Sequence, residues 1–265
     1  MVFQSDYPIM FEVTPVAAFD DNYIWVVHDD RHAVAIDPGD AAALIGFLDS
    51  RQLDLLAVLI THHHGDHTGG ITQLRQRYDC PIYGPDNPRI RGISHIVREG
   101  DKLDFAELDL GLTVLATPGH TLDHISYIGD GYLFCGDTVF GCGCGKLFEG
   151  TPAMMAASLD KILALPDATR LCCAHEYTLD NIAFAKTIDG DNPDLLSREA
   201  SDRALRMQHR PTLPSTLAME KATNPFLRFH HPSMRPHAAR YLGRQAVDDA
   251  EILGAIRALK DRYDG

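Results

Sequence analysis

Three histidines and one aspartate of metal-binding type lie within six residues of the chain, at His62, His64, Asp66 and His67. Imidazole nitrogens and carboxylate oxygens are ligands that Zn²⁺ and other first-row divalent metals accept. In an extended segment residues two apart point to the same side, so His62 and His64 can converge on one ion. Asp66 and His67 lie past a turn and can face a second ion. The alternative is a histidine-rich surface loop, but a uniform scatter of 14 histidines rarely places four within six positions.

Four more residues of suitable type follow apolar runs elsewhere in the chain. They are Asp37 after the run 33–36, His120 after 112–116, Asp137 after 132–135 and His175 after 171–173. Taken singly, each is more often a satisfied loop residue than a ligand. Taken together, they stand at the same ends of successive strands, and loops at strand ends commonly carry functional residues. The sequence therefore predicts one site that is assembled from strand ends.

The elements that must position these residues alternate between short strands and helices over the first two thirds of the chain. Apolar runs bounded by turn residues predict strands, and the run 55–60 is apolar throughout, as in a strand buried on both faces. Asp40 is a suitable N-cap for a helix, and Pro152 stands in a first-turn position. The predicted strands are 33–36, 55–60, 81–83, 112–116, 125–128, 132–135 and 171–173, and the predicted helices are 40–51, 71–78 and 152–165.

The character of the chain changes after Tyr177, where strand-like runs disappear. Helix-like segments follow at 180–188, 194–208 and 248–262. A strand-rich part followed by a helical part predicts an α/β domain with a helical extension. We therefore expect a metal-binding domain over 1–177 and a helical domain over 178–265.

Composition and charge narrow the class of protein. The chain has 265 residues, is 45% hydrophobic and carries a net charge of 24 − 37 = −13, which disfavours nucleic acid as the main partner. No apolar run approaches the ~20 residues of a membrane span, and the first residues do not resemble a signal peptide. The six cysteines show no disulfide or zinc-finger pattern, so we expect free thiols and a cytoplasmic protein.

The net charge is unevenly distributed along the chain. Residues 1–177 carry 11 basic and 25 acidic side chains, a net of −14, whereas residues 178–265 carry 13 and 12, a net of +1. One interpretation is that the C-terminal part supplies positive charge to a site whose other wall is acidic. The other is a drift in surface composition, and charge alone does not decide between them.

The candidate metal ligands and their flanking residues carry a family resemblance. Asp37, the segment 62–67, His120, Asp137 and His175 resemble the five sequence motifs of the metallo-β-lactamase superfamily. The flanking sequence resembles the hydroxyacylglutathione hydrolase (glyoxalase II) family more narrowly. The stretches that carry this second resemblance are 21–25, 136–140, 143–150, 175–178 and 222–228.

The resemblance implies an αββα metallo-β-lactamase sandwich with a C-terminal helical domain and two divalent metal ions. It assigns His62, His64 and His120 to one ion, Asp66, His67 and His175 to the other, and Asp137 to a bridge between them. Zinc is the expected metal, with iron and manganese as alternatives. Asp37 is expected to hold a ligand or loop by hydrogen bonds. The β-lactamases themselves carry Cys at the position of Asp137, which argues against that activity.

The implied reaction is hydrolysis of S-(2-hydroxyacyl)glutathione thioesters by a metal-bridged hydroxide. S-D-lactoylglutathione would give D-lactate and glutathione, the second step of methylglyoxal detoxification. Asp66 and Asp137 are the expected catalytic residues, with Asp66 orienting the hydroxide.

The residues that the resemblance assigns to glutathione are Lys146, Phe148, Tyr177 and Arg228. Arg228 suits a carboxylate because its guanidinium makes two parallel hydrogen bonds. The chain departs from the family pattern in three places: Phe148 stands for a frequent Tyr, His231 for another base, and Asp123 for a usual Gly. Ordinary surface cations, or a tyrosine at the edge of the core, are the alternative interpretation of this set.

Two other classes of function remain as alternatives. One is another superfamily enzyme, a persulfide dioxygenase or a lactonase, although these lack the long helical extension. The other is a non-catalytic protein that binds glutathione conjugates. We expect a small-molecule thioester as the partner, no nucleic acid, no membrane and a monomer.

Overall fold

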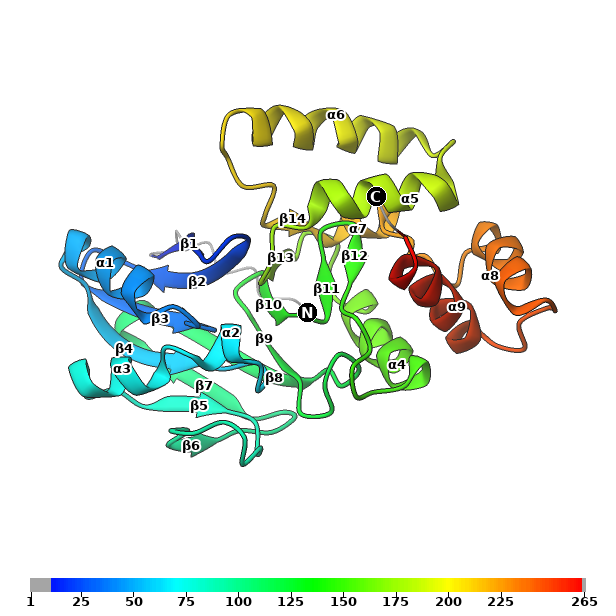
Figure 1. The fold of residues 1–265 in the computed structure, drawn as a ribbon. Helices are drawn as coiled ribbons and strands as arrows, with labels where there is room; N and C mark the ends of the chain where they lie inside the picture. Colours follow the sequence, from blue (N-terminus) through cyan, green and yellow to red (C-terminus); the bar gives the residue numbers. More distant parts are fainter. Residues whose placement is uncertain (1–10, 264–265) are drawn as a thin grey trace, which may run out of the picture.

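The computed structural model describes residues 11–263, which form two six-stranded sheets packed face to face with helices outside them (Figure 1). This arrangement confirms the expected α/β sandwich with a helical C-terminal part. Residues 1–10 and 264–265 lie outside the described part. The N-terminal residues considered for a signal peptide and the outer ends of the two predicted domains are therefore not described.

The first sheet has the strand order β1-β2-β3-β4-β5-β6. Its strands are β1 (Glu12–Ala18), β2 (Asn22–His28), β3 (His32–Ile36), β4 (Asp54–Leu59), β5 (Ile82–Gly84) and β6 (His95–Ile96). The pairs are antiparallel up to β3 and parallel from β3 to β6. Helices α1 (Ala41–Arg51) and α3 (Ile71–Arg77) share a second hydrophobic cluster with this sheet, and α2 (Gly65–Thr68) is a single turn. Asp40 caps α1 as predicted, because its side chain accepts hydrogen bonds from Ala42 N and Ala43 N.

The second sheet has the strand order β14-β13-β10-β9-β8-β7. Its strands are β7 (Lys102–Phe105), β8 (Leu110–Ala116), β9 (Ile125–Gly129), β10 (Tyr132–Gly136), β13 (Arg170–Cys173) and β14 (Ser215–Thr216). A 3-10 turn, η1 (Ala106–Leu108), joins β7 to β8, and the two-stranded hairpin of β11 (Val139–Phe140) and β12 (Gly143–Cys144) follows β10. Helix α4 (Pro152–Leu163) buries Met155, Leu159 and Ile162 in the same cluster as this sheet.

The main core lies between the two sheets. Trp25, Val27 and Ile36 of the first sheet are buried in one cluster with Val114 and Tyr127 of the second. Alternate residues of each strand face this layer, as sandwich packing requires. The packed sheets leave their loops at one end of the sandwich, where the predicted ligands lie.

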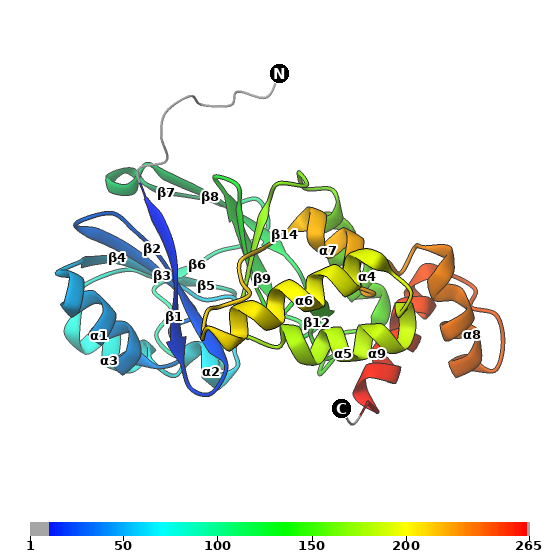
Figure 2. The ribbon, with the colours of Figure 1, turned by 90° about the horizontal axis from the view of Figure 1, so that it is seen from above.

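The C-terminal part packs at one side of the sandwich (Figure 2). It comprises α5 (Thr178–Asp189), α6 (Pro193–Met207), β14, α7 (Leu217–Thr223), η2 (Pro232–Met234), α8 (Arg235–Leu242) and α9 (Asp249–Asp261). Its side chains bind the backbone of the β11–β12 hairpin. Asn181 donates to Gly141 O, Asn224 to Phe140 O and Gly143 O, Arg257 to Cys144 O, and Glu220 accepts from Cys142 N.

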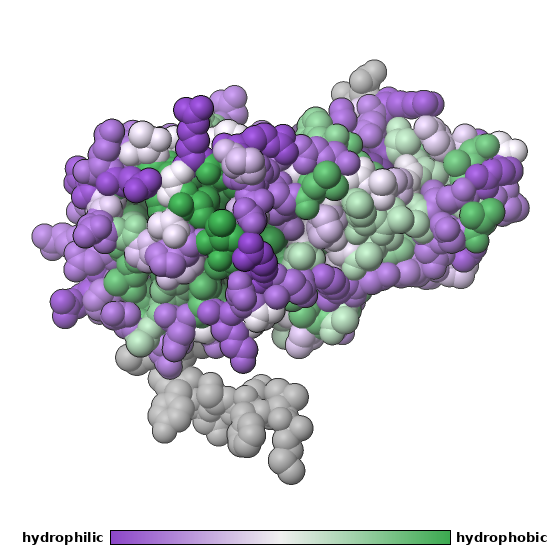
Figure 3. All heavy atoms as spheres, turned by 90° about the horizontal axis from the view of Figure 1, so that it is seen from below, coloured by the Kyte–Doolittle hydropathy of each residue, from purple (hydrophilic) through white to green (hydrophobic). Residues whose placement is uncertain are grey.

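The surface is mixed in character. Figure 3 shows one face with hydrophilic residues around its rim and hydrophobic residues gathered in the middle of the strand-rich part. None of the helices within residues 11–263 is long and apolar enough to cross a membrane.

Most predicted elements are present, with their ends shifted by a few residues, and several elements were not predicted. The prediction that strands end at Tyr177 is wrong at one place, because Ser215–Thr216 forms β14 beside β13. Strand β2 was not predicted, although its residues 23–27 form an apolar run and all seven of its residues are buried, the same pattern that predicted the strand at 55–60. Strand β1 contains Pro15, which sequence rules discount in a strand and which an edge strand tolerates. The cysteines are free thiols, as expected.

Candidate metal centre

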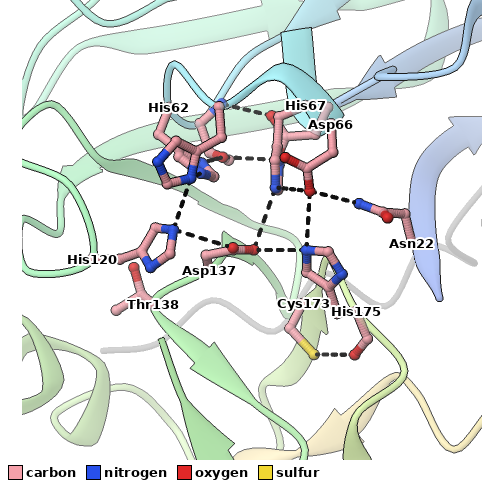
Figure 4. A network of polar contacts seen from close by, with 12 residues as sticks. Asn22, His62, Asp66, His67, His120, Asp137, Thr138, Cys173 and His175 are labelled. Carbon is pink, nitrogen blue, oxygen red and sulfur yellow. Dashed lines mark hydrogen bonds and ion pairs between the residues drawn. The ribbon is translucent and has the colours of Figure 1, made fainter. Parts of the chain in front are cut away.

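The predicted ligands converge at one end of the sandwich, where strands of both sheets end. Figure 4 shows His62, Asp66, His67, His120 and His175 around Asp137 in a network of polar contacts. The loop and single turn after β4 carry the segment 62–67, whereas the loops after β8, β10 and β13 carry His120, Asp137 and His175. The structure therefore brings together the residues that the sequence places more than 100 positions apart.

The first group contains His62, His64, His120 and Asp137. His64 Nδ1 lies 3.0 Å from His62 Nε2 and 3.0 Å from His120 Nε2. Asp137 Oδ2 lies 3.3 Å from His120 Nε2. Three ring nitrogens and a carboxylate oxygen thus point at one small volume.

The second group contains Asp66, His67 and His175. Asp66 Oδ2 lies 3.3 Å from the Nε2 atoms of both His67 and His175. The other carboxylate oxygen of Asp137, Oδ1, lies 3.4 Å from His67 Nε2 and 3.5 Å from His175 Nε2. The two oxygens of Asp137 therefore face different groups, which is the geometry of a bridging carboxylate.

In three of the candidate ligands, His67, His120 and His175, the ring nitrogen Nδ1 that is not aimed at the centre lies close to an oxygen atom. His67 Nδ1 lies 2.9 Å from Asp37 Oδ2, and His120 Nδ1 lies 2.8 Å from Lys146 O. His175 Nδ1 lies 2.7 Å from Asp21 Oδ1. Such a partner fixes the ring tautomer and aims the other nitrogen at the centre. Asp37 therefore lies where its expected role requires, and its carboxylate also accepts from Thr61 N and Thr61 Oγ1.

Two further residues, Asn22 and His124, hold Asp66 and Asp137 in place. Asn22 Nδ2 donates to Asp66 Oδ2 over 3.0 Å. The buried ring of His124 stacks on His62, and its Nε2 accepts from Asp137 N over 3.1 Å. His124 matched no ligand position in the sequence, and the structure shows it supporting the backbone of Asp137.

Burial and neighbouring charges shift the pKa values of the candidate histidines in different directions. Burial, followed by the positive charges of neighbouring histidines, lowers the pKa of His62 well below its usual value. Burial also lowers the pKa of His64 and of His120. Burial alone would lower the pKa of His175 too, but hydrogen bonds and charge from Asp66, Asp137 and Asp21 outweigh it and raise that pKa. Neutral imidazoles in the first group leave their lone pairs available to a metal.

Two independent observations indicate that the seven candidate ligands fit a metal centre. Two ligand atoms about 2.0–2.1 Å from one tetrahedral ion lie about 3.3–3.4 Å apart, close to the separations found within both groups. Asp137 Oδ1 and His67 Nε2 are buried and have no hydrogen-bond partner among the described residues. Buried polar atoms without partners are rare and point to a missing ligand.

A pocket of about 260 Å³ is lined by Phe140 and Tyr177, whose rings both pack on His175 of the second group. The ring of Tyr177 stacks on His175 with centroids 4.7 Å apart and forms one wall. Cations from both halves of the chain line it, namely Lys146, Arg257 and Lys260. The remaining lining residues are Phe140, Cys144, Asp180, Asn181 and Asp261.

The predicted substrate residues divide between this pocket and other places. Lys146 and Tyr177 line the pocket. Phe148 is 61% exposed, and its ring lies edge-on to His64 and His120, at the rim of the first group. Arg228 does not line the pocket; its guanidinium pairs with Asp189 over 3.3 Å. The geometry gives no support to the prediction that Arg228 holds a substrate carboxylate.

Sequence reasoning missed Arg257, Lys260 and Asp21. The first two lie on α9, more than 100 residues from Lys146, and nothing in their spacing marks them. Asp21 and Asn22 did carry a signal, because they begin the family-like stretch 21–25, but no role followed from it. The positive net charge of residues 178–265 also pointed to a cationic wall, which α9 provides in part.

Comparison with known proteins gives a consistent result. A family model described as "Metallo-beta-lactamase superfamily" matches residues 18–175, and one described as "Hydroxyacylglutathione hydrolase C-terminus" matches residues 176–263. A hydroxyacylglutathione hydrolase from Thiobacillus denitrificans is 66% identical over 256 residues, covering 97% of this chain and 100% of the relative.

Two solved structures share the fold. ETHE1 from Myxococcus xanthus superposes with a TM-score of 0.65 at 24% identity, covering 94% of this chain and 90% of that one. TTHA1623 in a di-iron-bound form gives a TM-score of 0.60 at 25% identity, covering 81% of this chain and 100% of that one.

Proposed function

The chain belongs to the hydroxyacylglutathione hydrolase family of the metallo-β-lactamase superfamily, and we propose that it hydrolyses S-(2-hydroxyacyl)glutathione thioesters with two divalent metal ions. S-D-lactoylglutathione is the proposed substrate, giving D-lactate and glutathione. One observation carries the proposal for this chain: the pocket lined by Lys146, Arg257 and Lys260 has Phe140 and Tyr177 as walls, and both of these rings pack on His175 of the His/Asp cluster.

The proposed metal ligands are the seven residues predicted from the sequence. His62, His64 and His120 would hold one ion, Asp66, His67 and His175 the other, and Asp137 both. The split of the Asp137 oxygens between the two groups supports a pair of ions. Zinc suits the mixture of imidazole and carboxylate, and the di-iron form of TTHA1623 supports iron as the alternative.

The bound ions would supply a hydroxide near neutral pH and stabilise the negative charge that develops on the thioester oxygen. Asp66 would orient the attacking oxygen, because its carboxylate lies in the second group and Asn22 fixes its orientation. A thiolate is a good leaving group, so the protein would need no strong proton donor. Asp37, Asp21 and His124 would keep the ligands in place.

The proposed glutathione subsite is the cationic pocket. Lys146, Arg257 and Lys260 would attract the carboxylates of the tripeptide, and Tyr177 would connect the subsite to His175. Arg257 is buried against Cys144 O and Asp261, so it shapes the pocket wall. Phe148 offers an exposed ring to the substrate but no hydroxyl group.

We also propose a metal-binding domain over 1–177, a helical substrate-binding domain over 178–265, a monomer, and a cytoplasmic location. The six free cysteines support a reducing compartment.

The test combines elemental analysis with substrate assays on one metal-loaded preparation. We expect two metal equivalents per chain and hydrolysis of S-D-lactoylglutathione, with most of kcat/KM lost when N-acetylcysteamine replaces glutathione in the thioester. Asp137→Ala should impair metal retention more than any single histidine variant, because Asp137 faces both groups. One equivalent in fully loaded protein would refute the paired centre. Efficient cleavage of the peptide-free thioester would refute the glutathione subsite.

A further inference from the structure

A second cluster of titratable side chains lies against the first group of candidate ligands, on the side away from its centre. His63 Nδ1 donates to Asp123 Oδ1 over 2.8 Å, and His63 Nε2 lies 3.6 Å from Glu149 Oε1. The side chains of His63 and Asp123 are only 8% and 9% exposed. The three residues come from the loops that follow β4, β8 and β12.

The ligand atoms of this cluster lie close enough together to hold a metal ion, and its outer contacts also give each carboxylate oxygen a hydrogen-bond donor. The second oxygen of Asp123 accepts from Asn87 Nδ2 over 2.8 Å. Glu149 accepts from the Arg89 guanidinium over 2.7 Å and from Leu122 N over 3.0 Å. Every carboxylate oxygen therefore already has a donor, and the acidic charge already has a cation. The cluster is a polar network in which hydrogen bonds join His63 to Asp123 and Asp123 to Asn87, and an ion-pair contact joins His63 to Glu149.

The position of His63 makes this network relevant to the metal centre. It lies between His62 and His64, and its ring points away from the nitrogens of those neighbours that meet 3.0 Å apart. Anchoring the His63 ring at Asp123 therefore restrains the two peptide groups that carry His62 and His64. A ligand pair held only by its own side chains would lack this restraint.

The other two members restrain the opposite side of the same centre. Asp123 follows His120 by three residues. The backbone N–H groups of Phe148 and Glu149 donate to His120 O over 3.1 and 3.4 Å. Three loops that surround the first group are thus tied together outside it.

We propose that His63, Asp123 and Glu149 form a positioning network that holds His62, His64 and His120 in their metal-binding geometry. The inference rests on the proposed function in taking these three histidines as metal ligands. The proposal gives a definite role to Asp123, where the chain departs from the family pattern of Gly. Asp123 accepts a hydrogen bond from His63 and, through Asn87, connects His63 to the loop before β6.

The test measures how fast metal-loaded protein releases its ions to excess chelator. Asp123→Ala removes the acceptor of His63, and we expect release of one metal equivalent to accelerate roughly tenfold, the lower end for outer-shell changes because the effect passes through the backbone. Asp123→Asn keeps an oxygen acceptor for His63 but turns its amide nitrogen toward Asn87 Nδ2, which is also a donor, so its release rate should fall between those of the wild type and Asp123→Ala. Asp49→Ala is the matched control, because it removes a carboxylate that pairs with Arg77 on the far surface.

Steady-state kinetics add a second measurement. Asp123→Ala should lower kcat several-fold and leave KM for the thioester unchanged, because the cationic pocket is untouched. If Asp123→Ala does not fold, Asn87→Ala replaces it, with an expected two- to threefold acceleration of release.

Equal release rates for wild type, Asp123→Ala and Asp49→Ala would overturn the proposal, as would an Asp123→Asn variant as labile as Asp123→Ala. The metal content and hydrolytic activity of the wild-type protein are measured separately. A wild type that binds metal but does not cleave the thioester would therefore refute the proposed function, while the ratio of release rates still decides the role of the network.

Discussion

Replacing Lys260 should weaken glutathione binding and leave the rate of the chemical step unchanged. Replacing Arg228 should change neither the binding nor the rate. Lys260 lines the pocket beside the metal centre, whereas Arg228 pairs with Asp189 outside it. Lys260→Met keeps most of the side-chain length and removes the charge. Arg228→Met makes the same kind of change at the residue that sequence reasoning favoured, so the pair of variants compares two assignments of the same role.

The magnitude follows from the surroundings of Lys260. A hydrogen bond to a charged partner contributes about 1.5–3 kcal/mol. Lys260 is half-buried, its Nζ already donates to Asp180 O over 3.3 Å, and burial with the charge of Arg257 lowers its pKa. We therefore take the lower end, about 1.5 kcal/mol, which corresponds to roughly a tenfold increase in KM. Because the contact is remote from the thioester carbon, kcat should stay unchanged.

Steady-state kinetics with S-D-lactoylglutathione and inhibition by free glutathione give the two measurements. The inhibition constant should rise by the same factor as KM, since both report binding of the tripeptide. Raising the ionic strength from about 0.1 to 1 M shortens the screening length from about 10 to 3 Å, so it should weaken wild-type binding more than that of Lys260→Met. An unchanged KM in Lys260→Met with an increased KM in a folded Arg228→Met would refute this reasoning and restore the original assignment.

Three other predictions concern metal binding, the buried core and pH. Asp21→Ala removes the oxygen that meets His175 Nδ1, and metal affinity measured by chelator competition should fall roughly 10- to 100-fold; unchanged affinity would exclude that role. Arg198→Met leaves the buried Glu220 carboxylate without its cation, so urea denaturation should show a loss of about 3–5 kcal/mol, part of it recovered in the double variant with Glu220→Gln, which removes the unpaired charge and keeps an oxygen for Cys142 N. The pKa of His230 is raised because two carboxylates outweigh burial, so its stabilising effect relative to His230→Gln should be complete below pH 6.5 and vanish as pH rises through that raised pKa; a pH-independent difference would contradict it.

The sequence was most informative where the chemistry is local. The segment 62–67 carries four of the seven candidate ligands, and the strand ends at His120, Asp137 and His175 follow from apolar runs that the core requires. Strands β10 and β13 are parallel, and β8 runs in the same direction because both β8 and β10 are antiparallel to β9. The carboxyl ends of these strands therefore lie at one edge, so a pattern of strand ends predicts a site without any knowledge of distances.

The sequence was least informative where the site depends on how distant segments pack. Lys260 lies on the last described helix, and the packing of α9 against α4, with the hydrogen bond from Lys260 to Asp180 O of α5, brings it near Lys146 and Tyr177. Arg228 lies in a family-like stretch, yet the turn after α7 directs it toward Asp189. The direction in which a side chain points is a tertiary property that spacing does not encode, so nothing in the sequence indicated Lys260 or the Arg228–Asp189 pair.

The way in which the C-terminal part holds the β11–β12 hairpin has an evolutionary consequence. The two family models meet between residues 175 and 176, which marks a joint in ancestry. The physical joint is different, because β14 completes the edge of β13 and side chains beyond residue 180 bind the hairpin backbone. A fragment ending at residue 177 would lose these partners, so we expect it to be less stable than the full chain. Exchange of the helical part between relatives would succeed only when the hairpin is exchanged with it.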